Sequence, residues 1–388
     1  MLFAATSSAE AQHKPRARDL GIPFDGAPGP LNAITDVPGV QVGLVTLIRE
    51  ARVGSGTPRA VRTGVTAILP RGRNSAEPVF GGWFPLNGNG EMTGTTWLEE
   101  SGFLEGPVMI TNTHSVGVVR DALVAASVEA DSPESSWWSL PVVGETYDGR
   151  LNDINGFHVR AEHLRAALDG ASAGPVAEGN VGGGTGMVCH EFKGGIGTAS
   201  RIVDARAGGF TVGALVQANH GRREWLRVDG VPVGREIGVD VVPSPYGPVP
   251  GHQPAPGSGS IIVVLATDAP LLPHHCERLA QRAGLGLARA GGTGGHTSGD
   301  LFIAFATGNR LPMPTSPEHP EPPLLYEVRA VGDGGIDALF NAAIEATEEA
   351  IVNALVAAET MTGRDGITAY ALPHERLQEV MAHYGRAD

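Results

Sequence analysis

Short apolar runs and amphipathic stretches alternate along most of this chain. Five runs are rich in apolar or β-branched residues and are flanked by Gly, Pro, Asn or Asp, which is typical of strands buried on both faces. They lie at 65–69, 108–110, 212–216, 261–266 and 301–306. Apolar residues at helical spacing predict helices over 115–126, 156–167, 274–290 and 336–359. Because the two kinds of element interleave, we expect α and β layers that share one core.

The last of these helices has the clearest apolar face. Its members are Ile336, Phe340, Ala343, Ile344, Ile351, Ala354 and Leu355. Thr347 is the one polar interruption of that face. Two proline-rich segments, 244–256 and 313–324, predict loops. The length of 388 residues suggests two or three domains or one large layered domain, and no boundary stands out.

Composition narrows the range of partners. The net charge is −14 and the 28 basic residues are scattered, which disfavours a nucleic-acid partner. The two cysteines, Cys189 and Cys276, imply no disulfide framework. No apolar run approaches the roughly 20 residues that span a bilayer, so we expect no membrane partner. The sequence favours a soluble protein that acts on a small molecule.

The N-terminus allows two interpretations. Residues 1–12 end in an Ala-x-Ala pattern that resembles a signal-peptidase site, but they lack a basic n-region and a full h-region. A periplasmic location follows if residues 1–11 are the end of a signal peptide. A cytoplasmic location follows if the chain is complete as written. We expect 1–25 to be a leader or signal-peptide remnant and 26–388 to be the folded part.

A small hydroxyl residue precedes the apolar run at 261–266. Ser260 follows Gly259, and glycine allows backbone conformations that other residues avoid, so the Ser260 hydroxyl could turn back on the Gly259 carbonyl. Cleavage there would make Ser260 a new N-terminus, whose α-amine, titrating at roughly pH 8, is a candidate general base. The alternative is that 257–260 is only a flexible linker.

The segment from 261 to 306 reads as a strand, a helix and a second strand. If the two strands run parallel, their starts lie at the same end of the sheet. Ser298 and Asp300 begin the second strand and would then come close to Ser260, giving a second hydroxyl to relay a proton and a carboxylate to orient it. The alternative for Ser298 and Asp300 is a polar turn at the strand entry.

Asn219 follows the run at 212–216. A side-chain amide at a strand end can donate a hydrogen bond to a developing oxyanion. The alternative is an Asx turn before Gly221.

The glycine clusters at 182–186 and 291–295 match neither a dinucleotide fingerprint nor a P-loop. The Gly-x-Ser-x-Gly match at 170–174 follows a helical segment, so it lacks the setting of a nucleophile elbow. Two segments contain metal-binding residue types, Cys189-His190-Glu191 and His274-His275-Cys276, but their spacing matches no zinc motif. We therefore expect no metal and no other cofactor.

Several longer motifs, in order, resemble the self-processing serine aminopeptidases, which include the L-aminopeptidase/D-esterase/amidase enzymes and the β-peptidyl aminopeptidases. The resemblance covers nearly the whole chain. It is carried by the segments 29–40, 64–70, 89–94, 111–117, 141–148, 259–266, 294–300 and 357–361.

This resemblance implies an αββα sandwich, shared with ornithine acetyltransferase and similar to N-terminal-nucleophile hydrolases, over residues 26–388. It also implies autocleavage between Gly259 and Ser260 into chains 1–259 and 260–388. Relatives form tetramers of processed heterodimers, so a homo-oligomer is expected.

The resemblance also assigns site residues. Ser260 matches the nucleophile, Ser298 the second serine, and Asn219 the oxyanion-stabilising asparagine. Asp300 stands where some members have Glu, which leaves either the Ser260 α-amine or the Ser298/Asp300 pair as the general base. Tyr147 matches a tyrosine near the nucleophile, and Glu145 is the partner for a substrate ammonium.

The function that this implies is an aminopeptidase that releases an N-terminal α- or β-amino acid from short peptides, amides or esters through an acyl-enzyme on Ser260. One alternative is an acyl transferase similar to ornithine acetyltransferase, although such enzymes use a threonine nucleophile. Another is a non-catalytic binding protein on the same fold.

Overall fold

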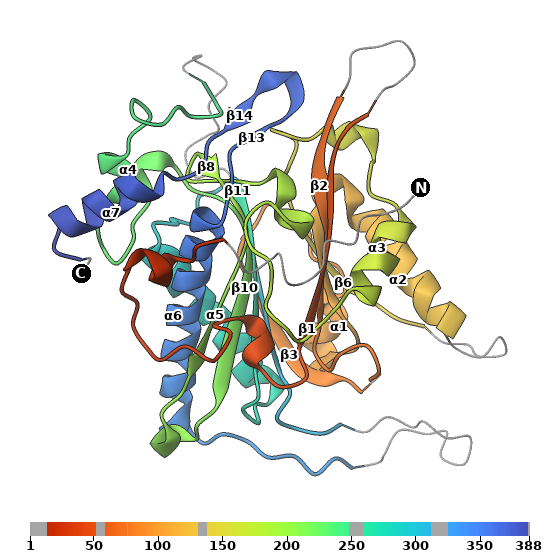
Figure 1. The fold of residues 1–388 in the computed structure, drawn as a ribbon. Helices are drawn as coiled ribbons and strands as arrows, with labels where there is room; N and C mark the ends of the chain where they lie inside the picture. Colours follow the sequence, from red (N-terminus) through yellow and green to blue (C-terminus); the bar gives the residue numbers. More distant parts are fainter. Residues whose placement is uncertain are drawn as a thin grey trace.

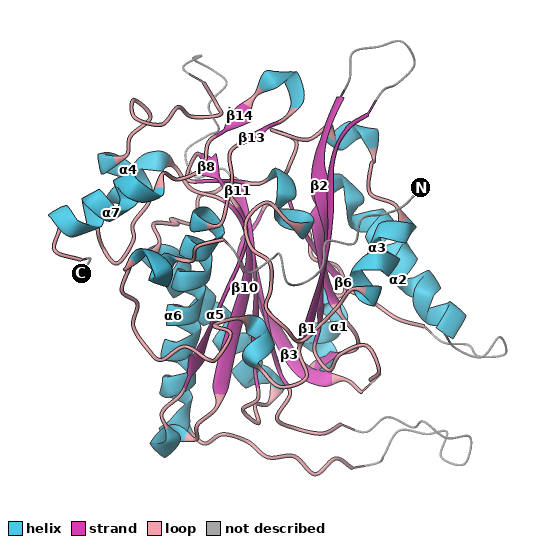
Figure 2. Cartoon of the chain, viewed as in Figure 1, coloured by secondary structure: helices cyan, strands magenta, loops and turns pink. Residues whose placement is uncertain are grey.

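Two β-sheets stack face to face, and helices cover the outer face of each (Figure 1). The computed structural model describes residues 14–51, 59–75, 77–130, 138–247, 259–311 and 325–386. Figure 2 shows the resulting order of layers, helix, sheet, sheet and helix. The predicted αββα sandwich is therefore confirmed.

The smaller sheet has four strands in the order β1-β2-β5-β6. Their bounds are β1 Gln41–Ala51, β2 Arg59–Leu69, β5 Val108–Asn112 and β6 Val142–Thr146. The β5–β6 pair is parallel and the other two pairs are antiparallel. Helices α2 (Val116–Ala130) and α3 (Ala161–Asp169) pack on the outer face of this sheet, where apolar side chains from both helices and all four strands form one cluster.

The larger sheet has six strands in the order β4-β3-β12-β11-β10-β9. Their bounds are β3 Val79–Gly88, β4 Phe103–Leu104, β9 Gly195–Ile202, β10 Thr211–Asn219, β11 Gly259–Thr267 and β12 Ser298–Ala306. β11 and β12 run parallel, joined by helix α5 (Pro273–Arg289), so the predicted strand-helix-strand unit is confirmed. Helix α6 (Asp333–Val356) lies beside α5 on the outer face.

Strand alternation divides the apolar residues of β11 and β12 between two cores. Ile262 and Val264 face the smaller sheet, whereas Ile261 and Val263 face the helices. Both strands are buried on both faces, as the apolar runs predicted. Full burial of each such side chain contributes about 1.5–3 kcal/mol, so the central strands are held firmly in register.

Helices α5 and α6 approach closely at Gly286. A Cβ at this position would lie 2.6 Å from the carbonyl oxygen of Ile344 and 2.6 Å from the Cβ of Thr347. Glycine is therefore required where the two helices cross, because any side chain would push them apart.

The remaining elements are short. The strands are β7 Val188–Cys189, β8 Phe192–Lys193, β13 Met361–Thr362 and β14 Thr368–Ala369, and the α-helices are α1 Thr95–Ser101, α4 Val233–Glu236 and α7 His374–His383. The 3₁₀ helices are Ala17–Leu20, Ile34–Asp36, Thr113–Ser115, Ile154–Gly156, Gly182–Gly186, Ala205–Ala207, Arg223–Trp225 and Arg364–Gly366. No helix in the described ranges is long and apolar enough to cross a membrane.

The N-terminal segment differs from the predicted leader. From Lys14 onward it is packed into the fold, and Ala17 and Ile22 are buried in the helix-side core. Arg18 pairs with the buried Glu349 of α6 at 2.8 Å, and Arg16 pairs with Glu178 at 2.7 Å. The folded part therefore begins before residue 26, because these ion pairs and apolar contacts fix residues 14–25 against α6 and β9.

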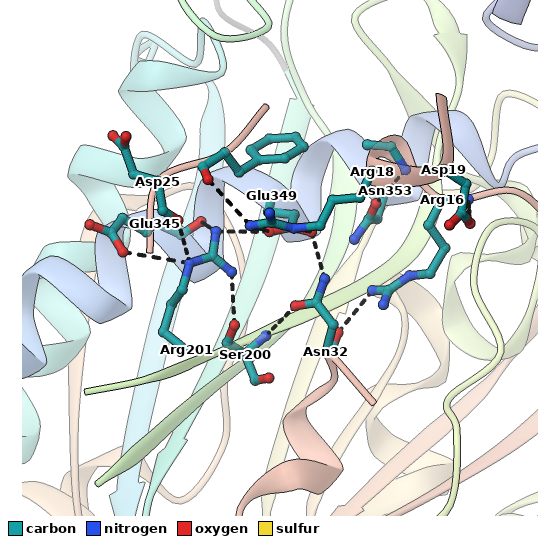
Figure 3. Close-up of polar contacts among 12 residues, drawn as sticks. Arg16, Arg18, Asp19, Asp25, Asn32, Ser200, Arg201, Glu345, Glu349 and Asn353 are labelled. Carbon is teal, nitrogen blue, oxygen red and sulfur yellow. Dashed lines mark hydrogen bonds and ion pairs between the residues drawn. The ribbon is translucent and has the colours of Figure 1, made fainter. Parts of the chain in front are cut away.

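Glu349 is the centre of this network (Figure 3). Its carboxylate also accepts hydrogen bonds from Asn32 Nδ2 at 2.6 Å and pairs with Arg201 at 2.8 Å. Burial alone would raise the pKa of Glu349, but the Arg18 hydrogen bond and the Arg201 charge outweigh it and hold that pKa below its usual range.

The predicted helix over 156–167 begins later than expected, at Ala161, because Phe157 takes a left-handed conformation with φ 49°. The predicted helix over 336–359 ends at Val356. The proline-rich segment 313–324 and most of 244–256 lie outside the described residues.

Candidate active site

Ser260 lies second in β11, between β10 and β12. Its Cα partner is Asn219 on the antiparallel β10 and Gly299 on the parallel β12. Gly259 precedes it with φ 137°, a conformation that favours glycine, as the sequence predicted. A Cβ on Gly259 would also lie 2.7 Å from the carbonyl oxygen of Asn219. The backbone conformation just before Ser260 therefore requires glycine at position 259.

The Ser260 hydroxyl meets the amide of Asn219. Asn219 Nδ2 lies 3.3 Å from Ser260 Oγ, and both side chains are buried. The same Nδ2 donates to the carbonyl oxygen of Tyr147 at 3.0 Å, and Asn219 Oδ1 accepts from the backbone N–H of Val188 at 2.9 Å. These contacts fix the amide with its donor side toward Ser260, which is the orientation that an oxyanion donor needs. No Asx turn forms from this side chain.

Ser298 and Asp300 form a hydrogen-bonded pair at the start of β12. The Ser298 hydroxyl donates to Asp300 Oδ1 at 2.6 Å, and Asn87 Nδ2 donates to Asp300 Oδ2 at 2.9 Å. Burial raises the pKa of Asp300, and the two hydrogen bonds oppose that rise. Ser298 therefore directs its proton at the carboxylate, and its lone pairs can accept a hydrogen bond from another group.

Register places this pair on the other face of the sheet from the Ser260 hydroxyl. Ser298 is the Cα partner of Gly259, one residue before the pairing of Ser260 with Gly299. Side chains alternate along a strand, so Ser260 points toward the smaller sheet, and Ser298 and Asp300 point toward the helices. A small cavity of about 10 Å³ on that helix side is lined by Ser298, Asp300, His220 and Leu287 of α5, among others. The pair is therefore beside the Gly259–Ser260 peptide bond rather than in front of the hydroxyl.

Glu145 approaches the same region from β6. Its Oε1 accepts from the backbone N–H of Glu91 at 3.0 Å, and its Oε2 accepts from Thr113 Oγ1 at 2.5 Å. The segment that carries Glu91 covers Gly299, since a Cβ on Gly299 would lie 2.9 Å from the Cα of Gly90. Glu145 is 4% exposed, and burial raises the pKa of its carboxyl group. An oriented, dehydrated carboxylate of this kind suits a cationic partner.

Tyr147 contributes its backbone rather than its ring to the contacts around Asn219. Its carbonyl oxygen accepts from Asn219 Nδ2, while the residue is 52% exposed. The structure thus brings Tyr147 to Asn219 and leaves its phenol at the surface.

Several residues at this site were not predicted from the sequence. Asn87, Thr113 and Val188 each donate a hydrogen bond to a candidate residue. Thr113 lies within the motif at 111–117 and Asn87 stands just before the motif at 89–94, whereas no sequence pattern indicated Val188. The two segments with metal-binding residue types lie in different surroundings. Cys276 Sγ faces the carbonyl oxygen of Phe80. Cys189 and His190 cluster with His220, which lies 30 residues beyond His190 in the sequence.

Comparisons with known proteins identify the family of this chain. Residues 32–369 match peptidase family S58. The chain is 52% identical, over 391 aligned positions, to the beta-peptidyl aminopeptidase BapA of Sphingosinicella microcystinivorans, covering 100% of this chain and 96% of that protein. It is 47% identical to the BapA of Sphingosinicella xenopeptidilytica, covering 98% and 93% of the two chains.

Two solved structures are similar over almost their whole length. A beta-aminopeptidase from a Burkholderia species superposes with a TM-score of 0.86 and 53% identity, covering 96% of this chain and 99% of the other. The second is the L-aminopeptidase D-Ala-esterase/amidase of Ochrobactrum anthropi, which is described as a prototype serine aminopeptidase and a variant of the Ntn hydrolase fold. It superposes with a TM-score of 0.86 and 49% identity, covering 97% of this chain and 100% of the other. The chain therefore belongs to peptidase family S58, and it is an aminopeptidase with the N-terminal-nucleophile hydrolase fold.

Proposed function

We propose that the chain cleaves itself between Gly259 and Ser260 and then uses Ser260 as its nucleophile. In the first step Ser260 Oγ attacks the Gly259 carbonyl, an ester replaces the peptide bond, and the nitrogen of residue 260 takes the proton. Water then hydrolyses the ester to give chains 1–259 and 260–388. The positive φ of Gly259 and its Cα pairing with Ser298 support this step.

In turnover the Ser260 hydroxyl attacks the first carbonyl of the substrate and forms an acyl-enzyme. The Asn219 amide, already within 3.3 Å of Ser260 Oγ, donates to the oxyanion, and this contact is the observation that carries the proposal. The new α-amine of Ser260 accepts the hydroxyl proton, and Ser298 with Asp300 hydrogen-bonds that amine from the helix side. Water releases the acyl residue.

The substrate is an amino acid residue with a free amine at the N-terminus of a peptide, amide or ester. Glu145 binds its ammonium group, since a buried carboxylate stabilises a dehydrated cation. Relatives at 47–53% identity that are beta-aminopeptidases support acceptance of β-amino acid residues. We also propose a homo-oligomer of the processed chains.

A substrate panel tests this proposal. Processed enzyme is incubated with p-nitroanilides of L-alanine, D-alanine and β-homoalanine, together with their N-acetylated forms, and release of p-nitroaniline is recorded. We expect turnover of the β-homoalanine compound with its amine free and none after acetylation. Equal turnover of acetylated and free compounds would refute the role of the ammonium group, and inertness toward the β compound would refute the β-residue assignment.

A further inference from the structure

Three buried metal-binding side chains meet on the helix side of the larger sheet. Cys189, His190 and His220 each offer one ligand atom, and these atoms all lie within 4.8 Å of one another. Cys189 and His190 belong to the β7–β8 hairpin, and His220 directly follows β10. All three residues are at most 4% exposed.

The two imidazoles present nitrogens that have no partner. His190 Nδ1 lies 2.9 Å from the carbonyl oxygen of Arg222, which can only accept, so this nitrogen carries the proton and Nε2 carries the lone pair. Within the described part of the chain, neither His190 Nε2 nor His220 Nε2 has a hydrogen-bond partner, and both are buried. Buried nitrogens without partners are unusual in folded proteins and call for an explanation.

The contact of His190 with Arg222 is also the arrangement expected of a metal-binding histidine. Such residues nearly always donate their second ring N–H to a carbonyl or carboxylate, which fixes the tautomer and the ring orientation. The ring is held further by its turn, because His190 and Glu191 both have positive φ, 47° and 62°. A tight two-residue turn thus holds this donor in place at a conformational cost.

The spacing is close to that of a filled site. Cys189 Sγ lies 3.9 Å from His220 Nδ1. Around zinc, bond lengths of about 2.3 Å to sulfur and about 2.0–2.1 Å to nitrogen with tetrahedral angles give a separation of roughly 3.5 Å. His220 Nδ1 is thus the ring nitrogen that faces Cys189, and since all three ligand atoms lie within 4.8 Å of one another, small side-chain rotations suffice to close the site.

We propose that Cys189, His190 and His220 form a binding site for a thiophilic metal ion, with Zn²⁺ as the ion that the donors fit best. One thiolate and two imidazoles are the donor types that zinc selects, whereas calcium and magnesium require oxygen ligands. On binding, the Cys189 thiol loses its proton to water as the metal–sulfur bond forms. This differs from the sequence expectation of no metal, because the third donor is distant along the chain.

The site is directly behind the candidate oxyanion donor. His220 is the residue after Asn219 and lines the same small cavity as Ser298 and Asp300. Cys189 is the residue after Val188, whose N–H holds Asn219 Oδ1. Because His220 and Cys189 each adjoin a residue that sets the position of this amide, metal loading is expected to slow turnover.

Cobalt(II) titration tests the site directly, because a cysteine thiolate bound to Co²⁺ gives a charge-transfer absorption in the near ultraviolet. The full-length wild-type protein is titrated with Co²⁺ and, in parallel, produced in zinc-supplemented medium and assayed for retained zinc. We expect the absorption to saturate at a single equivalent per chain, to disappear on addition of zinc, and to be lost in Cys189→Ser and in His220→Gln. Cys276→Ser is the matched control and retains it, because Cys276 is equally buried but its Sγ faces the carbonyl oxygen of Phe80, away from the three clustered ligand atoms.

Absence of both the absorption and retained zinc in the wild-type protein would overturn the proposal whether or not the variants fold. Persistence of the absorption in Cys189→Ser, or its loss in Cys276→Ser, would also overturn it. Ser260→Ala protein is included because it has no turnover in the mechanism above and must still bind cobalt. Metal binding and the proposed function can therefore fail independently.

Discussion

Ser260 and Ser298 begin neighbouring parallel strands one register step apart, so their side chains leave opposite faces of the sheet. Ser298 is paired with Gly259 and lies beside the peptide nitrogen of residue 260 rather than in front of the Ser260 hydroxyl. After cleavage that nitrogen becomes an α-amine. In the mechanism proposed above, Ser298 and Asp300 adjust that amine, while the hydroxyl meets substrate from the other side.

Replacement of Ser298 tests whether it acts on the α-amine of Ser260. Ser298→Ala removes an acceptor that favours the charged amine, so we expect the pKa of the amine to fall and the acid limb of the kcat profile to move to lower pH. Loss of the hydrogen bond that positions the amine as general base should lower kcat by about 100-fold with little change in KM. Ser127→Ala, on α2, is the control. An unchanged pH profile would mean that Ser298 is only structural.

Loss of the Asn219 amide should slow chemistry without weakening binding. Asn219→Ala is expected to lower kcat by about 100- to 1000-fold, the usual effect of removing one oxyanion donor. The exposed Asn341→Ala on α6 provides the matched control. Steady-state kinetics on processed enzyme checks this, and a change confined to KM would contradict the oxyanion role.

Glu145→Gln should weaken binding of substrates with a free amine. Burial raises the pKa of Glu145, so in the wild-type protein the binding carboxylate is lost as pH falls through that raised value. The variant should raise KM by about 10- to 100-fold and remove this acid limb of kcat/KM, since a charge-assisted contact contributes about 1.5–3 kcal/mol. Glu91→Gln keeps the backbone donor to Glu145 and serves as control. Equal KM values for both variants would argue against ammonium binding by Glu145.

Asp148 should make the fold less stable as pH rises. Burial raises the pKa of Asp148 from 3.8 to about 7, so between these values the folded chain binds more protons than the unfolded chain. Stability therefore decreases with rising pH across this window, by up to about 1.4 kcal/mol per pH unit. Asp148→Asn should flatten the dependence, and the exposed Asp121→Asn should not. Urea denaturation between pH 4 and 7 measures both, and equal slopes in all three proteins would exclude Asp148 as the cause.

The apolar runs alone predicted the central strands, whereas the αββα arrangement was predicted from the family resemblance. The central strands β10, β11 and β12 are buried on both faces, so each reads as an uninterrupted apolar segment. Strands β1 and β3 were not predicted, because their outer halves are partly exposed and interrupted by polar residues or glycine. The packed N-terminal segment was missed because ion pairs between distant residues, such as Arg18 and Glu349, leave no local pattern.

The site could be predicted only in part. Ser260, Ser298 and Asn219 stand at the ends of recognisable strands, so topology alone brings their backbones together. Which face each side chain takes depends on register, which no local pattern gives. The contact of His220 with Cys189 likewise depends on tertiary structure, because the β7–β8 hairpin packs beside the end of β10. The residues next to Cys189 in the sequence could not indicate that contact.

Intact-mass spectrometry of the wild-type protein and of Ser260→Ala tests the central claim most directly. The account predicts two chains from the wild type, the second beginning at Ser260, and one uncut chain without aminopeptidase activity from the variant. A wild-type enzyme that turns over substrate as a single uncut chain, or a variant that still splits before residue 260, would contradict it.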